Sequence, residues 1–274
     1  MRMRSRLNLA YRGVRARTHD GKRIRAKVQA VSTLSAILVL VVSGSARLAD
    51  QRLNLDVNDP RPLAAALEQL EKRHGWVITY DDPPYLYAPD IEDVTLAVRR
   101  DGDITRRVLV PRGGRFRFEY SAPADGGAPN AALVLERLLE EYHLTGYPGM
   151  FRVIATGTVF HVVPSESRNA SGVFAPCVSL LDAKISIPDS ERSVFSTVTA
   201  IVEAASRQLG ARVGLGTVPV NVLMQRRVHE RATNESARTV LMRTLASTHR
   251  QLSWRLFCDP GASAQCSLNL HLVE

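Results

Sequence analysis

One pattern occurs twice in this chain and constrains its fold more than any other feature. Each copy begins with a short strand of alternating apolar and polar residues and continues with a helix of about four turns that a glycine ends. Further strands and a second helix follow. The two terminating glycines, Gly75 and Gly210, lie 135 residues apart (210 minus 75). A repeat of this length predicts two tandem domains rather than a solenoid of short units.

The first copy combines helix-period and strand-period segments. Its expected elements are a strand at 53–57, a helix that Asp59 can cap and Gly75 ends, a strand at 76–80, a helix from Asn130 to Gly146, and a hairpin over 150–163. In the second helix, apolar residues gather on one side and Glu or Arg on the other, which is typical of a helix packed against a sheet.

The second copy follows the same order. Its expected elements are a strand at 184–187, a helix capped by Asp189 or Ser190 and ended by Gly210, strands at 212–215 and 220–223, a helix opened by Thr233 or Asn234, and a hairpin over 252–273. Both copies therefore predict an α+β fold: two tandem βαββαβ-type domains, each with a mixed sheet packed by two helices.

The first copy carries an additional segment at about 85–129. We expect strands at Val94 to Val98 and at Ile104 to Val110 around an Asp101-Gly102 turn, followed by a strand in which aromatic residues alternate with charged ones from Arg115 to Tyr120. This segment is predicted to extend the sheet.

The element order resembles the short N-terminal (STN) domain of secretins and TonB-dependent receptors. The residues that carry the resemblance in the first copy are 53–55, 62–67, 74–80 and 135–140, and in the more divergent second copy 208–213, 237–246 and 252–256. The resemblance implies a domain that docks other envelope proteins. It does not imply a channel, because neither a secretin pore region nor an outer-membrane barrel follows the second copy in this sequence.

Charge divides the chain near residue 46. Ten of the 36 basic residues but only one of the 27 acidic residues lie in residues 1–46, so the other 228 residues hold 26 of each. The high net charge therefore belongs to the N-terminal segment, and the remainder carries no excess of Lys and Arg for a nucleic-acid surface. We expect no nucleic-acid partner.

The basic segment precedes an apolar run at 34–42 and the small residues of 43–46, which is the pattern of a secretory signal. Cleavage after Ala46 is one interpretation. The other is an uncleaved anchor, since the 17 residues from Ala30 to Ala46 are near the lower limit for spanning a bilayer. Both place residues 47–274 in the periplasm, and only the second leaves the protein attached to the inner membrane.

Domain boundaries follow from composition. The polar, small residues after Pro164 predict a linker over 165–176, between a first domain at 47–164 and a second at 177–274. The last hairpin carries Cys258 and Cys266 at its two inner ends. They can form a disulfide or remain free thiols, and Cys177 is left over.

Motifs for chemistry are missing from the sequence. The seven histidines show no metal-ligand spacing, Gly214-Leu215-Gly216 lacks the remainder of a dinucleotide motif, and the Asp81-Asp82 and Glu140-Glu141 pairs are typical of solvated acids. We expect no catalytic, metal-binding or cofactor-binding residues, and a protein that is not an enzyme.

A Tyr- and Pro-rich segment is the candidate contact. Tyr80, Pro83, Pro84, Tyr85 and Tyr87 can present rigid aromatic area to a partner, or their rings can pack back onto the sheet. The predicted function is an exported adaptor that docks another envelope protein. The alternatives are recognition of a cell-wall or glycan ligand and, more distantly, a hydrolase.

Overall fold

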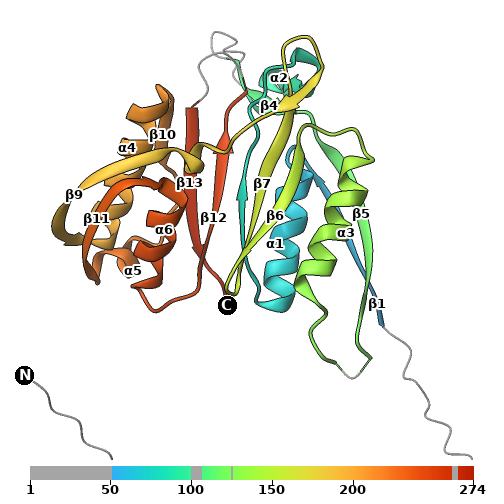
Figure 1. The fold of residues 1–274 in the computed structure, drawn as a ribbon. Helices are drawn as coiled ribbons and strands as arrows, with labels where there is room; N and C mark the ends of the chain where they lie inside the picture. The colour runs from blue at the N-terminus through green and yellow to red at the C-terminus, as the bar shows by residue number, and fades with distance from the viewer. Residues whose placement is uncertain (1–50, 100–106, 125, 261–264) are drawn as a thin grey trace, which may run out of the picture. The chain divides into compact units, whose positions relative to one another are not determined.

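The structure is a computed structural model, and it describes residues 51–99, 107–124, 126–260 and 265–274. The predicted export segment and the predicted Asp101-Gly102 turn lie outside these residues. Within them, no helix is long and apolar enough to cross a membrane. Residues 47–274 form one compact unit, whose elements are coloured along the chain in Figure 1.

The first half of the unit contains the helices and strands expected for the first copy, with short extra elements after the second strand. In order they are β1 (Gln51–Asp59), α1 (Pro62–His74), β2 (Val77–Asp81), the 3-10 helix η1 (Ala88–Asp90), β3 (Ile91–Asp93), α2 (Thr95–Val98), β4 (Leu109–Pro111), β5 (Gly114–Ala122), α3 (Ala131–His143), β6 (Met150–Thr156) and β7 (Val159–Arg168).

The second half repeats the main elements of this order. After β8 (Phe174–Pro176) and the 3-10 helix η2 (Leu180–Asp182) come β9 (Lys184–Ser193), α4 (Val194–Leu209), β10 (Arg212–Leu215), α5 (Val220–Met224), β11 (Arg227–Ser236), α6 (Ala237–Ala246), β12 (Leu252–Cys258) and β13 (Gln265–Leu272). The α+β class predicted from the sequence is confirmed.

Glycine ends the first helix of each half, as the sequence predicts. Gly75 has φ +66° after α1, and Gly210 has φ +63° after α4. This left-handed conformation lets the chain turn out of the helix, and glycine adopts it without a steric penalty. The chain can therefore reverse direction after each helix and enter the following strand.

Strand pairing is also the same in both halves. The first strand pairs antiparallel with the strand that precedes the second helix, β1 with β5 and β9 with β11. The other three strands form a sheet in which the last strand lies in the middle: β2-β7-β6 in the first half and β10-β13-β12 in the second. In each set the middle strand pairs in parallel with the first strand named (β7 with β2, β13 with β10) and antiparallel with the third (β7 with β6, β13 with β12).

The two three-stranded sheets are joined edge to edge. β12 pairs with β2 in parallel, with Arg255 opposite Tyr80 and Leu256 opposite Asp81. The joined order is β10-β13-β12-β2-β7-β6, with β8 paired to β7 outside this path. The strands β10 and β6 are therefore the two ends of the path.

The helices of the two halves cover opposite faces of this sheet. Opposed residues in neighbouring strands point to the same face, and Tyr80 lies in the core of the first half whereas Leu256 lies in the core of the second. Since Tyr80 and Asp81 are consecutive in β2, the two cores lie on opposite faces. Figure 1 shows α1 and α3 on one side of the sheet and α4 and α6 on the other.

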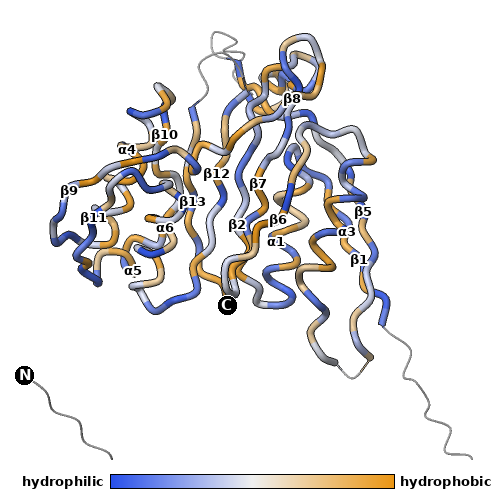
Figure 2. Tube along the Cα trace, in the orientation of Figure 1, coloured by the Kyte–Doolittle hydropathy of each residue, from blue (hydrophilic) through white to orange (hydrophobic). Residues whose placement is uncertain are grey.

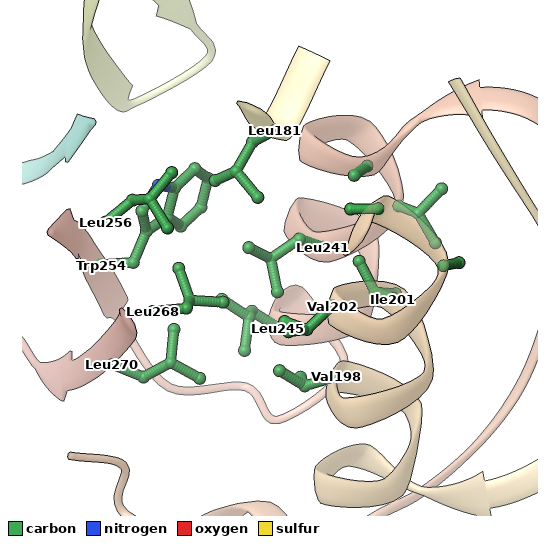
Figure 3. Packing of buried hydrophobic residues seen from close by; sticks show 14 of the residues in the cluster. Leu181, Val198, Ile201, Val202, Leu241, Leu245, Trp254, Leu256, Leu268 and Leu270 are labelled. Carbon is green, nitrogen blue, oxygen red and sulfur yellow. The ribbon is translucent and has the colours of Figure 1, made fainter. Parts of the chain in front are cut away.

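Each half therefore has a separate hydrophobic core. In the second half, Trp254, Leu256, Leu268 and Leu270 of the sheet face α4 and α6. Figure 3 shows Leu241 and Leu245 of α6 pointing toward them. Figure 2 shows apolar and polar segments alternating along the strands and helices, as expected for elements with one buried face.

Two short segments predicted as strands are helical. Asp93 Oδ1 accepts the N–H of Thr95, which starts the turn α2 where a strand at Val94 to Val98 was expected. Pro219 precedes α5, and its carbonyl accepts the N–H groups of Val222 and Leu223, so the expected strand at 220–223 closes into a helical turn. In both cases local hydrogen bonds override the β-branched composition.

Three further predictions are wrong, two about where a helix begins and one about the sheet that β5 joins. β9 continues to Ser193, whose side chain caps α4 in place of Asp189 or Ser190, and β11 continues to Ser236, which caps α6 in place of Thr233 or Asn234. β5 does not extend the large sheet but pairs with β1. Long strand ladders thus persist until a serine can accept a helix N–H.

The predicted linker at 165–176 is partly ordered as strands. β7 continues through its first residues to Arg168, and β8 pairs back onto β7 with Phe174 opposite Arg168. Arg168 also donates to Asp90 Oδ1 at 2.6 Å.

Candidate functional site

The Tyr- and Pro-rich segment is largely buried. Tyr80 and Tyr85 are 2% and 7% exposed, Pro83 is buried, and the Tyr85 hydroxyl donates to Asp82 Oδ1 at 2.9 Å. Of the predicted contact residues, only Pro84 and Tyr87 reach the surface. The rings of Tyr80 and Tyr85 therefore pack back onto the sheet, the second of the two alternatives.

Charged residues that the sequence suggested were solvated are buried where the halves meet. Asp81 is fully buried at the end of β2, where it accepts from Arg238 Nη2 at 2.6 Å and from Trp254 Nε1 at 3.0 Å. The Ser179 hydroxyl also donates to it. Since Arg238 and Trp254 belong to the second half, this carboxylate ties the halves together.

Asp82 makes a second link of the same kind. Its Oδ2 accepts from Arg61 Nε at 2.7 Å and from the N–H of Cys258 at 2.9 Å, while its own N–H donates to the Leu256 carbonyl. Burial raises the pKa of Asp82, and the Arg61 guanidinium and the Cys258 N–H act in the opposite direction. A carboxylate placed just after β2 thus closes the strand junction.

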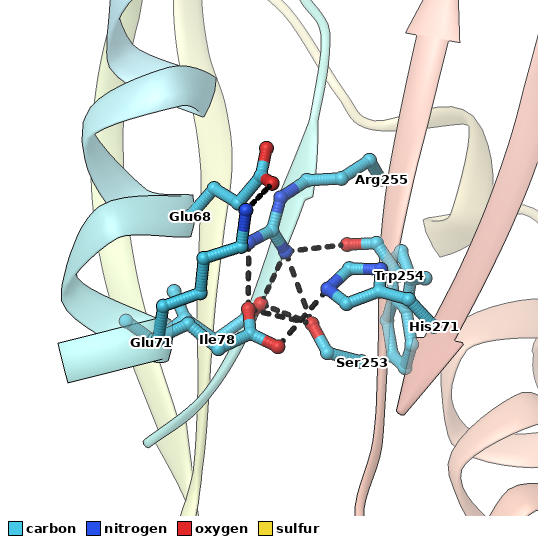
Figure 4. Close-up of polar contacts among 8 residues, drawn as sticks. Glu68, Glu71, Ile78, Ser253, Trp254, Arg255 and His271 are labelled. Atoms are coloured by element: carbon cyan, nitrogen blue, oxygen red, sulfur yellow. Dashed lines mark hydrogen bonds and ion pairs between the residues drawn. The ribbon is translucent and has the colours of Figure 1, made fainter. Parts of the chain in front are cut away.

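A third buried pair lies on the other face of the junction (Figure 4). Arg255 Nη2 donates to Glu71 Oε2 at 2.7 Å, and both side chains are at most 6% exposed. Arg255 and Ser253 also contact the Ile78 carbonyl on β2, and His271 Nε2 lies 3.0 Å from Glu71 Oε1. α1 of the first half is thereby held to β12 and β13 of the second.

This network lacks the order of a hydrolytic triad. In a triad the histidine contacts the nucleophile directly and the acid orients the histidine, whereas Glu71 here stands between His271 and Ser253. Ser253 is also fully buried. Across the described part of the chain, no group of three or more His, Cys, Asp or Glu side chains is placed to hold a metal ion.

A cavity of about 660 Å³ opens beside this pair. It lies between α1 and one face of β12 and β13. The helices α4 and α6 cover the opposite face of these two strands. Its walls carry both signs of charge, including Glu68, Lys72, Arg255, His271 and Glu274, together with Phe257 and Asn269.

His161 is the one strongly perturbed histidine among the described residues. Its Nδ1 lies 2.7 Å from the Thr79 hydroxyl, and its ring stacks on Trp254 with centroids 5.3 Å apart. Burial, and secondarily the charge of Arg238, lowers the pKa of His161 to about 4.

This shift predicts a loss of stability on acidification. The unfolded chain binds a proton at His161 near pH 6.5 and the folded chain only near pH 4, so the contribution is complete above pH 6.5 and is lost as the pH falls. We expect His161 to account for about 2 kcal/mol of the stability lost between pH 8 and pH 5. Denaturant unfolding of His161→Gln at both pH values should show a pH dependence smaller by this amount. Exposed His229→Gln is the matched control, and an equal change in both variants would contradict the assignment.

The sulfur atoms of Cys258 and Cys266 lie at bonding distance, 2.07 Å, across the β12–β13 hairpin. This placement is consistent with the predicted disulfide. Cys177 is a free, partly buried thiol, and burial raises its pKa, so it has less thiolate character than an exposed cysteine.

The two ends of the sheet differ in their hydrogen bonding. At β10, the Ser206 hydroxyl bonds both the N–H and the carbonyl of Val213, so the backbone groups of this residue are already satisfied. At β6, His143 Nε2 accepts the outward N–H of Phe151, but no other described strand pairs with the outer side. Arg152 is exposed with no ion pair among the described residues. An open edge of this kind can accept a partner strand.

Comparison with known proteins identifies no relative: no protein-family model, curated protein or solved structure matches this chain.

Proposed function

We propose that this protein is an exported, non-catalytic adaptor of the cell envelope that docks another envelope protein. The proposal treats both halves as STN-like domains, the second divergent, and places residues 47–274 in the periplasm. The observation that carries it is the contrast between the two sheet edges: at β10 Ser206 bonds both backbone groups of Val213, whereas at β6 the Phe151 N–H is bonded by His143 and no described strand pairs beyond it.

Two further features support this proposal. The residues resembling the STN family lie in elements that have the same order and pairing in both halves, as two copies of one domain would. The cysteine pair at bonding distance is compatible with an oxidising compartment such as the periplasm.

Export predicts a definite mass. Protein recovered from the envelope fraction of its native host should begin at Arg47 and be two hydrogens lighter than the reduced chain. Intact mass spectrometry without reductant measures both properties at once. A cleaved chain in the soluble periplasmic fraction would exclude the anchor, and a full-length, fully reduced chain would contradict export.

Docking is tested in the same cells. Cross-linking before lysis should give a species containing this chain and one defined envelope protein, and purified samples of the two should bind each other. Recovery of this chain only as a monomer, with no binding between the purified proteins, would contradict the adaptor function.

A second candidate, recognition of a cell-wall or glycan ligand, is favoured by the cavity of about 660 Å³. Its mixture of Phe257, Asn269 and charged side chains suits a polar ligand with an apolar face. Retention on isolated cell-wall glycan, lost in Asn269→Ala, would support it over protein docking.

A further inference from the structure

The internal repeat assigns each strand at the sheet edge a counterpart in the other half. The glycine after the first helix is followed by β2 in one half and β10 in the other, and these pair with β7 and β13 in matching register. In this register Leu268 of β13 takes the place of Val162 of β7. Val153 lies opposite Val162 on β6, and Leu256 lies opposite Leu268 on β12. By this alignment β6 corresponds to β12, and Arg152 corresponds to Arg255.

β12 shows how this kind of edge takes a partner strand. The Leu256 carbonyl accepts the N–H of Asp82, and the N–H of Cys258 donates to the carboxylate of the same Asp82. Arg255 reaches past the strand to Glu71 on the helix that precedes β2. The docked partner is therefore a parallel strand followed by a carboxylate, with a second carboxylate within reach of the arginine.

The corresponding groups on β6 face outward. Phe151 donates its N–H to His143 Nε2, away from β7, and alternate residues of an antiparallel strand point to the same side. Val153 and Ala155, the counterparts of Leu256 and Cys258, therefore direct their backbone groups to the open edge. Ala155 and Arg152 are exposed. The N–H of Ala155 and the guanidinium of Arg152 can therefore bind an acidic partner.

A second copy of this chain is a poor occupant. In a second copy, the strand that corresponds to β2 and would pair with β6 is β10. Ser206 corresponds there to Glu71, because each lies four residues before the glycine that ends its helix. Its hydroxyl already satisfies Val213. The second copy thus lacks both the free edge and the carboxylate that Arg152 would pair with, which favours a different protein.

From this comparison we infer that β6 is the docking edge of the adaptor. It binds in parallel an extended segment of a partner protein that carries one carboxylate just after the strand, for the Ala155 N–H, and a second shortly before it, for Arg152. The contacts made by Arg152 and by the Ala155 N–H reproduce those of Arg255 and Cys258. This inference rests on the proposed docking function and names its site and its recognition chemistry.

A peptide with the sequence of residues 71–83 is a direct probe, because it contains β2, the two aspartates that β12 binds within the molecule, and Glu71, the carboxylate that pairs with Arg255. We expect the full chain to bind the labelled peptide saturably in a fluorescence anisotropy titration. Arg152→Glu should weaken binding about tenfold or more, as expected when an attractive charge becomes repulsive. Ala155→Pro, which removes only an outward N–H at an edge, should weaken it as well.

Matched controls separate this site from general charge effects. Arg137→Glu makes the same charge change on an exposed face of α3 and should leave binding unchanged, and a peptide with both aspartates replaced by asparagine should bind weakly to the unaltered chain. Circular dichroism checks that Ala155→Pro is folded. Equal binding by Arg152→Glu and Arg137→Glu, or no saturable binding up to about 1 mM, would overturn the inference.

These outcomes are independent of the test of the adaptor function. A partner cross-linked in the envelope together with no peptide binding would leave the function standing and reject β6 as its site. Peptide binding that depends on Arg152, with no envelope partner and no export, would leave the edge chemistry standing and reject the cellular role.

Discussion

Trp254→Ala is expected to lower the free energy of unfolding by about 3–5 kcal/mol, the range for removing a large aromatic side chain from a core. Trp254 is 1% exposed and packs among the apolar residues of the second half, yet its ring stacks on His161 and its Nε1 donates to Asp81, both in the first half. Its removal leaves a cavity, and at the same place it takes the Trp254 donor away from the buried Oδ1 of Asp81.

The measurement is denaturant or thermal unfolding of the full chain. At about 2–4 °C per kcal/mol for a unit of this size, the midpoint should fall by roughly 10 °C. The other tryptophan of the chain is the control. Trp76 is partly exposed, and among the described rings it stacks on His74 alone, so Trp76→Ala should cost much less. Equal losses for the two variants would show that Trp254 does not hold the halves together.

Glu71→Gln is expected to cost about 3 kcal/mol or more, because it leaves the Arg255 guanidinium buried without its carboxylate. The double variant Glu71→Gln/Arg255→Met should recover part of this loss, since breaking a buried pair costs more than removing both charges. Such recovery separates the charge interaction from the packing of the two side chains.

Glu68→Gln is the matched control, one turn earlier on α1. Glu68 pairs with Lys72 at 2.6 Å, but both side chains are more than half exposed, so its loss should change the free energy of unfolding by no more than about 0.5 kcal/mol. Chemical denaturation of the four proteins gives the comparison. If Glu71→Gln and Glu68→Gln lose the same small amount, the buried pair does not stabilise the junction.

The candidate sites show where prediction from sequence stops. Cys258 and Cys266 could be paired because they flank one hairpin, a local relation. Tyr80 and Tyr85 could not be placed, because a Tyr- and Pro-rich loop has the same composition whether it binds a partner or packs inward. Asp81 and Asp82 were interpreted as solvated, and no sequence pattern pointed to Arg238, Arg61 or Cys258 as their partners, which lie far away along the chain.

The sequence by itself determined the features that depend on residues close together in the chain. Gly75 and Gly210 end the first helices, the apolar periods separate helices from strands, and their order recurs in both copies, because these depend on local backbone preferences and on the burial of one face. Only the tertiary structure decided that β12 joins β2, that the helices of the two halves cover opposite faces, and that no described strand pairs with the outer side of β6. Strand edges offer nearly the same hydrogen-bonding groups in every sequence, so the choice among them depends on contacts between residues far apart in the chain.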